Sequence, residues 1–109
     1  EVKAEPIPTR SRSIVQKRSH GLCERCGGKG MHWHHRRRRN VRDSHTHCPC
    51  NGIYLCSKCH TEVHSEVFTA RADGFIISVN DSPSEVPVAT YSGMVYLSCN
   101  GNIDFRSDV

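Results

Sequence analysis

Four cysteines in this chain have the spacing of zinc ligands. They form two C-x-x-C pairs that lie about thirty residues apart: Cys23 and Cys26, then Cys56 and Cys59. Four thiolates complete the tetrahedral ligand set of a structural Zn²⁺ site. We therefore expect a zinc ion that joins two distant segments. Disulfides are disfavoured because the cysteines are odd in number, seven in all, and closely spaced within each pair.

A second set of candidate ligands consists of imidazoles. His60 and His64 are four residues apart in a segment with a helical pattern, so they share one helix face. His34, from a predicted strand, would complete a set of three imidazoles that leaves coordination positions open, as in catalytic sites. His35 would point to the other side of that strand and is suited to accept a proton from water at neutral pH.

Asn51 and a run of arginines are the remaining candidates. Asn51, nine residues before His60, is placed to hydrogen-bond either the intervening loop or His35, and either contact would fix the orientation of the base. The segment 10–42 holds eleven Lys or Arg and one acid, whereas 43–109 holds three basic residues and eight acids. This segregation predicts phosphate contact through the arginines that follow the histidine doublet: Arg36, Arg37, Arg38 and Arg39.

The chain has 109 residues and 36% hydrophobic content, enough for one small domain that needs a staple such as zinc. It has no apolar stretch typical of a secretory signal or a membrane span. We therefore expect a reducing, cytoplasmic setting. The missing initiator Met and the polar, proline-containing start suggest a fragment of a longer chain.

The local patterns divide the chain into three parts. Residues 1–9 are expected to be a flexible leader, 10–72 a core with the zinc knuckle, and 73–109 a β-rich extension that is packed on the core or appended to it. In the core the patterns predict a helix over 10–19, strands over 31–36 and 53–56, a long loop between them, and a helix from Ser57 as N-cap. In the extension they predict strands over 74–79, 86–90, 94–98 and 103–105.

The stretch from about Gly21 to His64 resembles the zinc-knuckle branch of the HNH (ββα-metal) endonucleases of phages and bacteria. It reads C-E-R-C-G, then W-H-H-R-R, then N-G-I-Y-L-C-S-K-C-H-T-E-V-H, and covers about two fifths of the chain. The resemblance implies a small α+β fold in which a four-cysteine zinc site staples a ββα-metal core, followed here by a small antiparallel β tail. It also implies the residue roles, with His34, His60 and His64 as metal ligands, His35 as the general base and Asn51 as the residue that supports the loop.

The implied activity is metal-dependent hydrolysis of DNA phosphodiester bonds, by nicking or by double-strand cutting. His35 would take a proton from a water molecule that attacks phosphorus in line, and a divalent metal (Mg²⁺, Mn²⁺, Ni²⁺ or Zn²⁺) would stabilise charge on the phosphoryl oxygens and on the leaving 3′-oxygen. The products would carry 5′-phosphate and 3′-hydroxyl ends. Imidazole ligands suit the transition metals better than Mg²⁺.

The loop after the histidine doublet departs from the family pattern. It lacks the Pro and Gly-Gly that often follow the doublet and contains His45, His47, Cys48 and Cys50 instead. The two cysteines would either replace a knuckle cysteine or join one of the histidines in a further metal site. A single residue between two thiols is poor chelate spacing, which disfavours both readings. Cys99 lies alone in a strand pattern and is expected to be a small core residue.

Alternatives remain for individual histidines and for the whole chain. His32 shares a strand face with His34 and could replace it as ligand, and His60 could instead complete a zinc site of three cysteines and one histidine. The competing function is a zinc-stapled nucleic-acid-binding module without nuclease activity, and a toxin nuclease with an acidic immunity partner is a third. DNA is the expected partner and no membrane is expected. A homodimer or a larger phage or host protein is a further partner class, and the tail is either part of the core or a docking unit.

Overall fold

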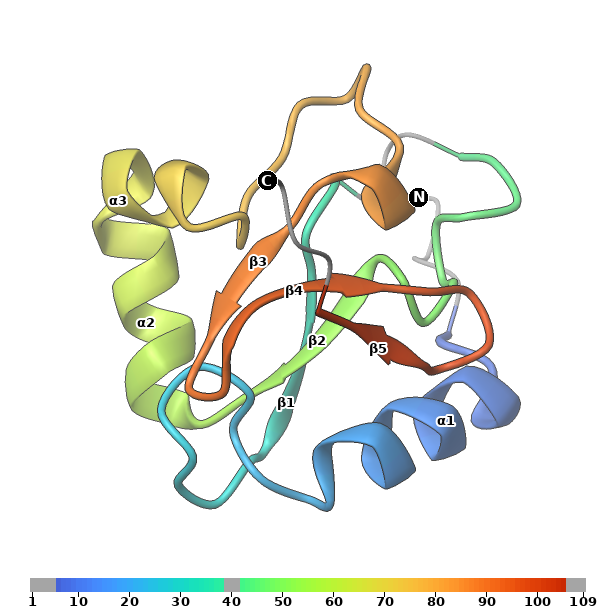
Figure 1. Cartoon of the computed structure of the whole chain (residues 1–109), viewed down its shortest axis with the longest axis horizontal. Coiled ribbons are helices and arrows are strands. Elements are labelled where there is room, and N and C mark those ends of the chain that lie inside the picture. The colour runs from blue at the N-terminus through green and yellow to red at the C-terminus, as the bar shows by residue number, and fades with distance from the viewer. Residues whose placement is uncertain (1–5, 39–41, 106–109) are drawn as a thin grey trace.

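The computed structural model describes residues 6–38 and 42–105, so most of the predicted leader and Arg39 lie outside the described residues. It is a small α+β structure with two antiparallel sheets, as expected from the sequence (Figure 1). Its elements in chain order are α1 (Thr9–Ser19), β1 (His32–His35), β2 (Gly52–Leu55), α2 (Ser57–Ser65), α3 (Val67–Ala72), a 3₁₀ turn (Pro83–Glu85), β3 (Val88–Thr90), β4 (Gly93–Leu97) and β5 (Ile103–Asp104). None of the helices described is long and apolar enough to cross a membrane.

Strands β1 and β2 form the hairpin that carries the histidine doublet. His34 lies opposite Ile53 and His35 opposite Gly52. The indole of Trp33 covers Gly52 so closely that a Cβ there would lie 2.0 Å from the ring. A side chain at position 52 would therefore displace the ring and disturb the hairpin.

Helix α2 follows the hairpin directly, and its cap lies one residue before the predicted one. The N-cap is Cys56, not Ser57, and the Cys56 sulfur accepts a hydrogen bond from the Cys59 amide. The apolar pattern of this helix continues to Val67 in the sequence, but the helix is interrupted at Glu66, after which α3 forms a separate short helix. Figure 1 shows α2 and α3 on one side of the sheets and α1 on the other.

The prediction of a strand over 74–79 is wrong. In the structure this segment has no strand partner and instead runs across the end of the hairpin, where the Phe75 amide donates to Ala70 O and the Ile77 amide donates to Arg36 O. Phe75 is buried in the core because its apolar ring fills the space beside α3. The apolar run signals burial here, not strand pairing.

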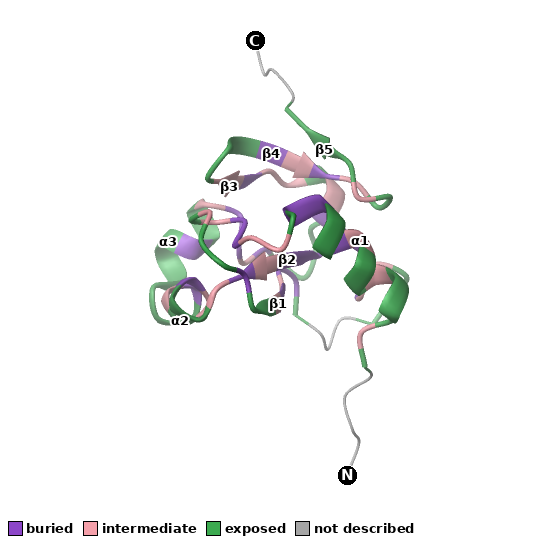
Figure 2. Ribbon diagram, turned by 90° about the horizontal axis from the view of Figure 1, so that it is seen from below, coloured by how far each residue is buried: buried purple, intermediate pink, exposed green. Residues whose placement is uncertain are grey.

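One buried cluster joins the N-terminal and C-terminal parts of the chain. Ile53, Leu55 and Val63 from the hairpin and α2 pack with Val88, Val95 and Leu97 from the C-terminal sheet. Figure 2 shows buried segments in the hairpin and in the sheet β3–β4–β5, which lies over it. The described part of the C-terminal segment, 73–105, therefore shares its buried side chains with the hairpin and α2.

A buried ion pair fixes α1 against the hairpin. Arg18 makes two hydrogen bonds to the Glu24 carboxylate, at 2.9 and 2.8 Å, and donates to the carbonyls of Pro49 and Gly52, each at 2.7 Å. Glu24 in turn accepts from the Tyr54 amide at 2.9 Å. The guanidinium group is thus matched by a carboxylate and by carbonyls, which a buried charge requires.

Candidate metal centres and active site

The four knuckle cysteines lie together at the start of α2. Their sulfur atoms are all within 4.8 Å of one another, so the group is compatible with a structural zinc ion. Cys23 and Cys59 are buried, whereas Cys26 reaches the surface. The first knuckle closes through a hydrogen bond from the Cys23 amide to Gly28 O and one from the Gly27 amide to Cys23 O, with Gly27 at a positive φ of 84°.

Hydrogen bonds and burial shift the pKa values of the thiols in this group in opposite directions. The Cys59 amide lowers the pKa of the Cys56 thiol to about 7, and burial raises the pKa of Cys59 to about 12. The Gly28 amide also points at the Cys26 sulfur, at 3.4 Å. Four adjacent sulfurs repel one another when all are ionised, so the complete thiolate set requires a cation, which is the charge that Zn²⁺ supplies.

The second group of ligands brings together the three histidines expected from the sequence. One ring nitrogen each from His34, His60 and His64 lies within 4.8 Å of the others. The ring centroids of His60 and His64 are 4.9 Å apart, and that of His34 is 5.4 and 5.3 Å from them. Strand β1 and helix α2 therefore converge on one point, which fits a divalent metal held by imidazoles.

His34 is held from behind by the C-terminal segment. Its Nε2 is 2.7 Å from the carbonyl oxygen of Phe75, so the ring donates there and leaves Nδ1 as its metal-binding atom. Burial lowers the pKa of His34 to about 4, and burial together with the nearby His64 lowers the pKa of His60. Both rings are therefore neutral near pH 7, the state in which imidazole binds a metal.

The three histidines open onto a cleft of about 790 Å³. The hairpin, α2 and α3 contribute its lining. Besides apolar side chains, the cleft is lined by histidines and by arginines, of which Arg38 and Arg71 are exposed and Arg36 is buried in the wall: His34, His35, His60, His64, Arg36, Arg38 and Arg71. Exposed cations beside an open ligand set suit a phosphate-containing substrate.

Comparison with family models, curated proteins and solved structures finds no match for this chain. The resemblance to the HNH endonucleases therefore stays an expectation from the sequence motifs.

His35 lies next to the ligand set and contacts the loop that precedes β2. Its Nε2 is 3.1 Å from Nδ1 of His47, and the two ring centroids are 5.2 Å apart. When His35 donates in this hydrogen bond, the lone pair that accepts a proton is on its Nδ1. The sequence indicates His47 only as a candidate metal ligand, because residue spacing carries no signal for a contact between two rings across a loop.

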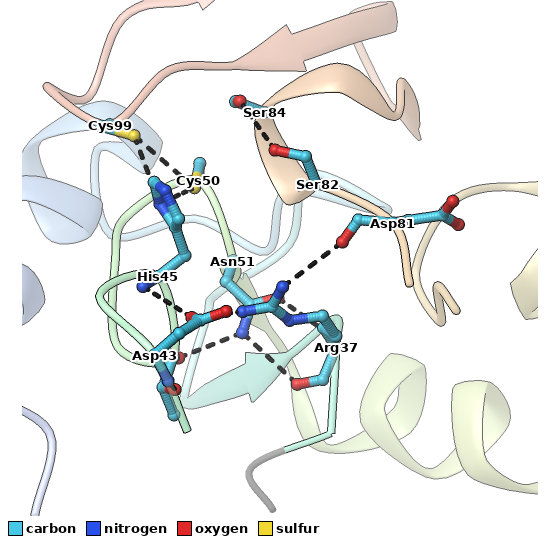
Figure 3. Close-up of polar contacts among 10 residues, drawn as sticks. Arg37, Asp43, His45, Cys50, Asn51, Asp81, Ser82, Ser84 and Cys99 are labelled. Carbon is cyan, nitrogen blue, oxygen red and sulfur yellow. Dashed lines mark hydrogen bonds and ion pairs between the residues drawn. The ribbon is translucent and has the colours of Figure 1, made fainter. Parts of the chain in front are cut away.

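Asn51 braces the loop and is fully buried. Its Oδ1 accepts from the Arg37 amide at 2.7 Å, and its Nδ2 donates to the carbonyls of Arg37 and Thr46 (Figure 3). Of the two contacts expected for Asn51, the structure has the one to the loop. Asn51 is thus a positioning residue for the strand end that carries His35.

Of the four arginines expected to contact DNA, Arg36 makes its hydrogen bonds inside the fold. Its side chain is buried, and its guanidinium group donates to four backbone carbonyls: Gly74, Cys50, Pro83 and Val86. Burial lowers the pKa of Arg36 to about 10, so it stays charged at neutral pH. Four adjacent arginines suggest one basic patch in the sequence, but Arg36 follows the end of β1 and finds its backbone acceptors inside the fold.

Arg37 is also turned inward, whereas Arg38 is not. The Arg37 side chain is paired with Asp43 at 2.6 Å (Figure 3). The His45 amide and the Arg37 guanidinium lower the pKa of Asp43. Arg38 is exposed in the cleft, and Arg71 on α3, which the sequence did not single out, joins it there.

The alternative ligand His32 is engaged elsewhere. It lies beside His60, with ring centroids 5.3 Å apart, but its Nε2 is 3.2 Å from Ser57 Oγ. It is exposed and does not belong to the group of three nitrogens.

A third group combines the loop with the C-terminal sheet. His45, Cys48, Cys50 and Cys99 have ligand atoms within 4.8 Å of one another, a set compatible with structural zinc. The expectation that Cys99 is a core residue is wrong, because its side chain is exposed and contacts His45 and Cys50. We call this group the loop cluster.

Proposed function

We propose that this chain is a metal-dependent endonuclease of the HNH type that hydrolyses phosphodiester bonds in DNA. The observation that carries the proposal is the convergence of His34, His60 and His64 in an open cleft, with His35 beside them. Three imidazoles with room for substrate are a catalytic ligand set, and a structural site has no use for a base next to it.

The residues have separate roles in the proposed reaction. His34, His60 and His64 hold a divalent metal, which when bound supplies positive charge to the phosphate and to the leaving oxygen. His35 takes a proton from water as the O–P bond forms and the P–O3′ bond breaks, and His47 holds the His35 ring in place. Arg38 and Arg71 bind backbone phosphates, which positions DNA without reading its sequence.

The competing proposal is a nucleic-acid-binding module that uses the same zinc staple. It requires exposed cations and a stable fold, but neither His35 nor open metal positions. The two proposals therefore differ in what His35 does.

The test is cleavage of supercoiled plasmid by protein stripped of loosely bound metal, with Mg²⁺, Mn²⁺ or Ni²⁺ added back. We expect nicked or linear product only with added metal, and a loss of about 10²- to 10⁴-fold in rate for His35→Ala. DNA affinity in a gel shift should be unchanged in this variant.

His20→Asn is the matched control. His20 is an exposed histidine at the end of α1, outside the cleft and in a left-handed conformation that Asn tolerates. This variant should cut like the parent protein. Binding without cutting under every metal would remove the nuclease proposal, and equal cutting by His35→Ala would remove His35 as its base.

A further inference from the structure

Three ligand atoms of the loop cluster have the mutual distances of ligands in a tetrahedral metal site. Cys50 Sγ and Cys99 Sγ are 3.8 Å apart, and His45 Nδ1 lies 3.8 Å from the first and 3.7 Å from the second (Figure 3). Zinc–sulfur bonds of about 2.3 Å at tetrahedral angles separate two sulfurs by about 3.8 Å, and a zinc-bound nitrogen from a sulfur by about 3.5 Å. A disulfide would need about 2.05 Å between sulfurs.

The knuckle site provides an internal comparison. Its Cys26 and Cys56 sulfurs are also 3.8 Å apart, the same separation as in the loop cluster. Cys48 completes the loop cluster as the fourth ligand. Although only one residue separates Cys48 from Cys50, both sulfurs lie within 4.8 Å of the ligand atoms of His45 and Cys99.

The loop cluster also joins two parts of the chain that are far apart in the sequence. His45, Cys48 and Cys50 lie in the loop between β1 and β2, and Cys99 lies in the turn between β4 and β5. The described part of the loop is built from short turns, such as those closed by the bond from the Cys48 amide to His45 O and from the Asn51 amide to Cys48 O. It nevertheless carries His47 and Asn51.

We propose that the loop cluster binds a second structural zinc ion, which clamps the β4–β5 turn onto the loop that holds His47 and Asn51. The site is separate from both the knuckle zinc and the three-histidine set. Its consequence is an ordered loop next to His35, in a segment that has turns in place of a helix or strand.

The experiment counts zinc by native mass spectrometry in a His64→Ala background. His64 is exposed, and its loss removes the three-histidine set, so the count reports only thiolate sites. We expect two zinc ions per chain in this background and one after the additional change Cys99→Ser. Met94→Ser, at an exposed position of the same sheet and outside the cluster, should keep two.

Alkylation gives an independent readout in the parent protein and does not need a variant. Cys99 is exposed and Cys48 half-buried, so both react quickly unless a metal holds their thiolates. With zinc bound we expect both to be protected, and a chelator should release them. In Cys99→Ser, hydrogen exchange should rise in residues 45–51 and stay unchanged in residues 23–28.

Several results would overturn the proposal. These are one zinc ion in the His64→Ala background, fast alkylation of Cys99 in zinc-loaded folded protein, or a Cys50–Cys99 disulfide in protein purified without reductant. None of these measurements depends on cleavage, so a failure here is distinct from a failure of the nuclease proposal.

Discussion

Arg36 and Arg38 are two residues apart and have opposite environments. Arg36 is buried among four carbonyl acceptors, and Arg38 faces the cleft. We expect Arg36→Met to lower the free energy of unfolding by about 3 kcal/mol or more, because it leaves buried carbonyls without donors. Urea denaturation of the zinc-loaded protein measures this.

Arg38→Met is the matched control, since it makes the same chemical change at an exposed position. Its free energy of unfolding should stay within about 0.5 kcal/mol of the parent value. Equal effects of the two substitutions would contradict the assignment of Arg36 to the core.

His47 is expected to act on the proposed reaction through His35. His47→Ala should lower kcat by roughly ten- to hundredfold, because the base loses its fixed orientation, and should leave KM unchanged. His47→Asn should restore part of the rate, since its amide can hydrogen-bond the same ring nitrogen. A parallel loss in both variants, or a change confined to KM, would exclude a positioning role.

At the residue scale, the sequence predicts ligands better than it predicts their partners. The knuckle cysteines and the histidines of the cleft are recognisable because their spacing is local or lies on one helix face. The partner of His34 is a backbone carbonyl 41 positions away. Backbone groups leave no signature in a sequence, and the acceptors of Arg36 are backbone groups as well.

At the element scale, the hairpin and α2 form the frame of the site, and within the hairpin the Trp33 ring lies directly against Gly52. We expect Gly52→Ala to destabilise the protein by about 1–3 kcal/mol, because the new methyl group meets the Trp33 ring at 2.0 Å. Thermal unfolding measures the loss.

Gly28→Ala is the control for this substitution. A Cβ at Gly28 meets only Cys26 Sγ, at an ordinary 3.5 Å. A drop in stability of similar size would mean that the loss of glycine itself, and not the Trp33 contact, decides the result.

The core elements could be predicted because each has a clear local pattern. The predicted strand over 31–36 contains β1, the one over 53–56 overlaps β2, and the helix from 57 contains α2. The segment 74–79 could not be predicted in the same way. Its apolar run is used for burial beside α3, and its amides pair with α3 and with Arg36, which only the assembled fold brings near.

At the scale of the whole molecule, the charge around the cleft determines the expected salt dependence. Arg71→Gln should weaken DNA binding for all sequences alike and reduce the slope of log K against log salt by about one, because one phosphate contact is lost. Arg10→Gln removes the same charge from α1, outside the cleft, and should have a smaller effect. Fluorescence anisotropy over a salt series compares them, and equal slopes would exclude the cleft as the DNA site.

Zinc removal should affect the entire fold. The buried cluster is small, and a structural zinc site contributes roughly 10 kcal/mol or more of binding free energy in small domains, as much as the whole stability of many proteins. We expect a strong zinc chelator to abolish the cooperative unfolding transition. The fluorescence of Trp33, the only tryptophan, measures this transition. Zn²⁺ should restore it and Mg²⁺ should not. An unchanged unfolding transition in zinc-free protein would contradict the expectation that a structural zinc ion stabilises the fold.

Because the Phe75 carbonyl accepts from His34, the segment that holds the ligands cannot be transferred alone into another protein. The segment 10–72 contains every signature residue, yet the acceptor for His34 and three of the four acceptors for Arg36 come later in the chain. A chimera that contains only residues 10–72 would keep the ligands and lose the backbone carbonyls that orient His34 and hold Arg36. A transferable unit must also keep the sheet β3–β4–β5, because Val88, Val95 and Leu97 complete the buried cluster with the hairpin.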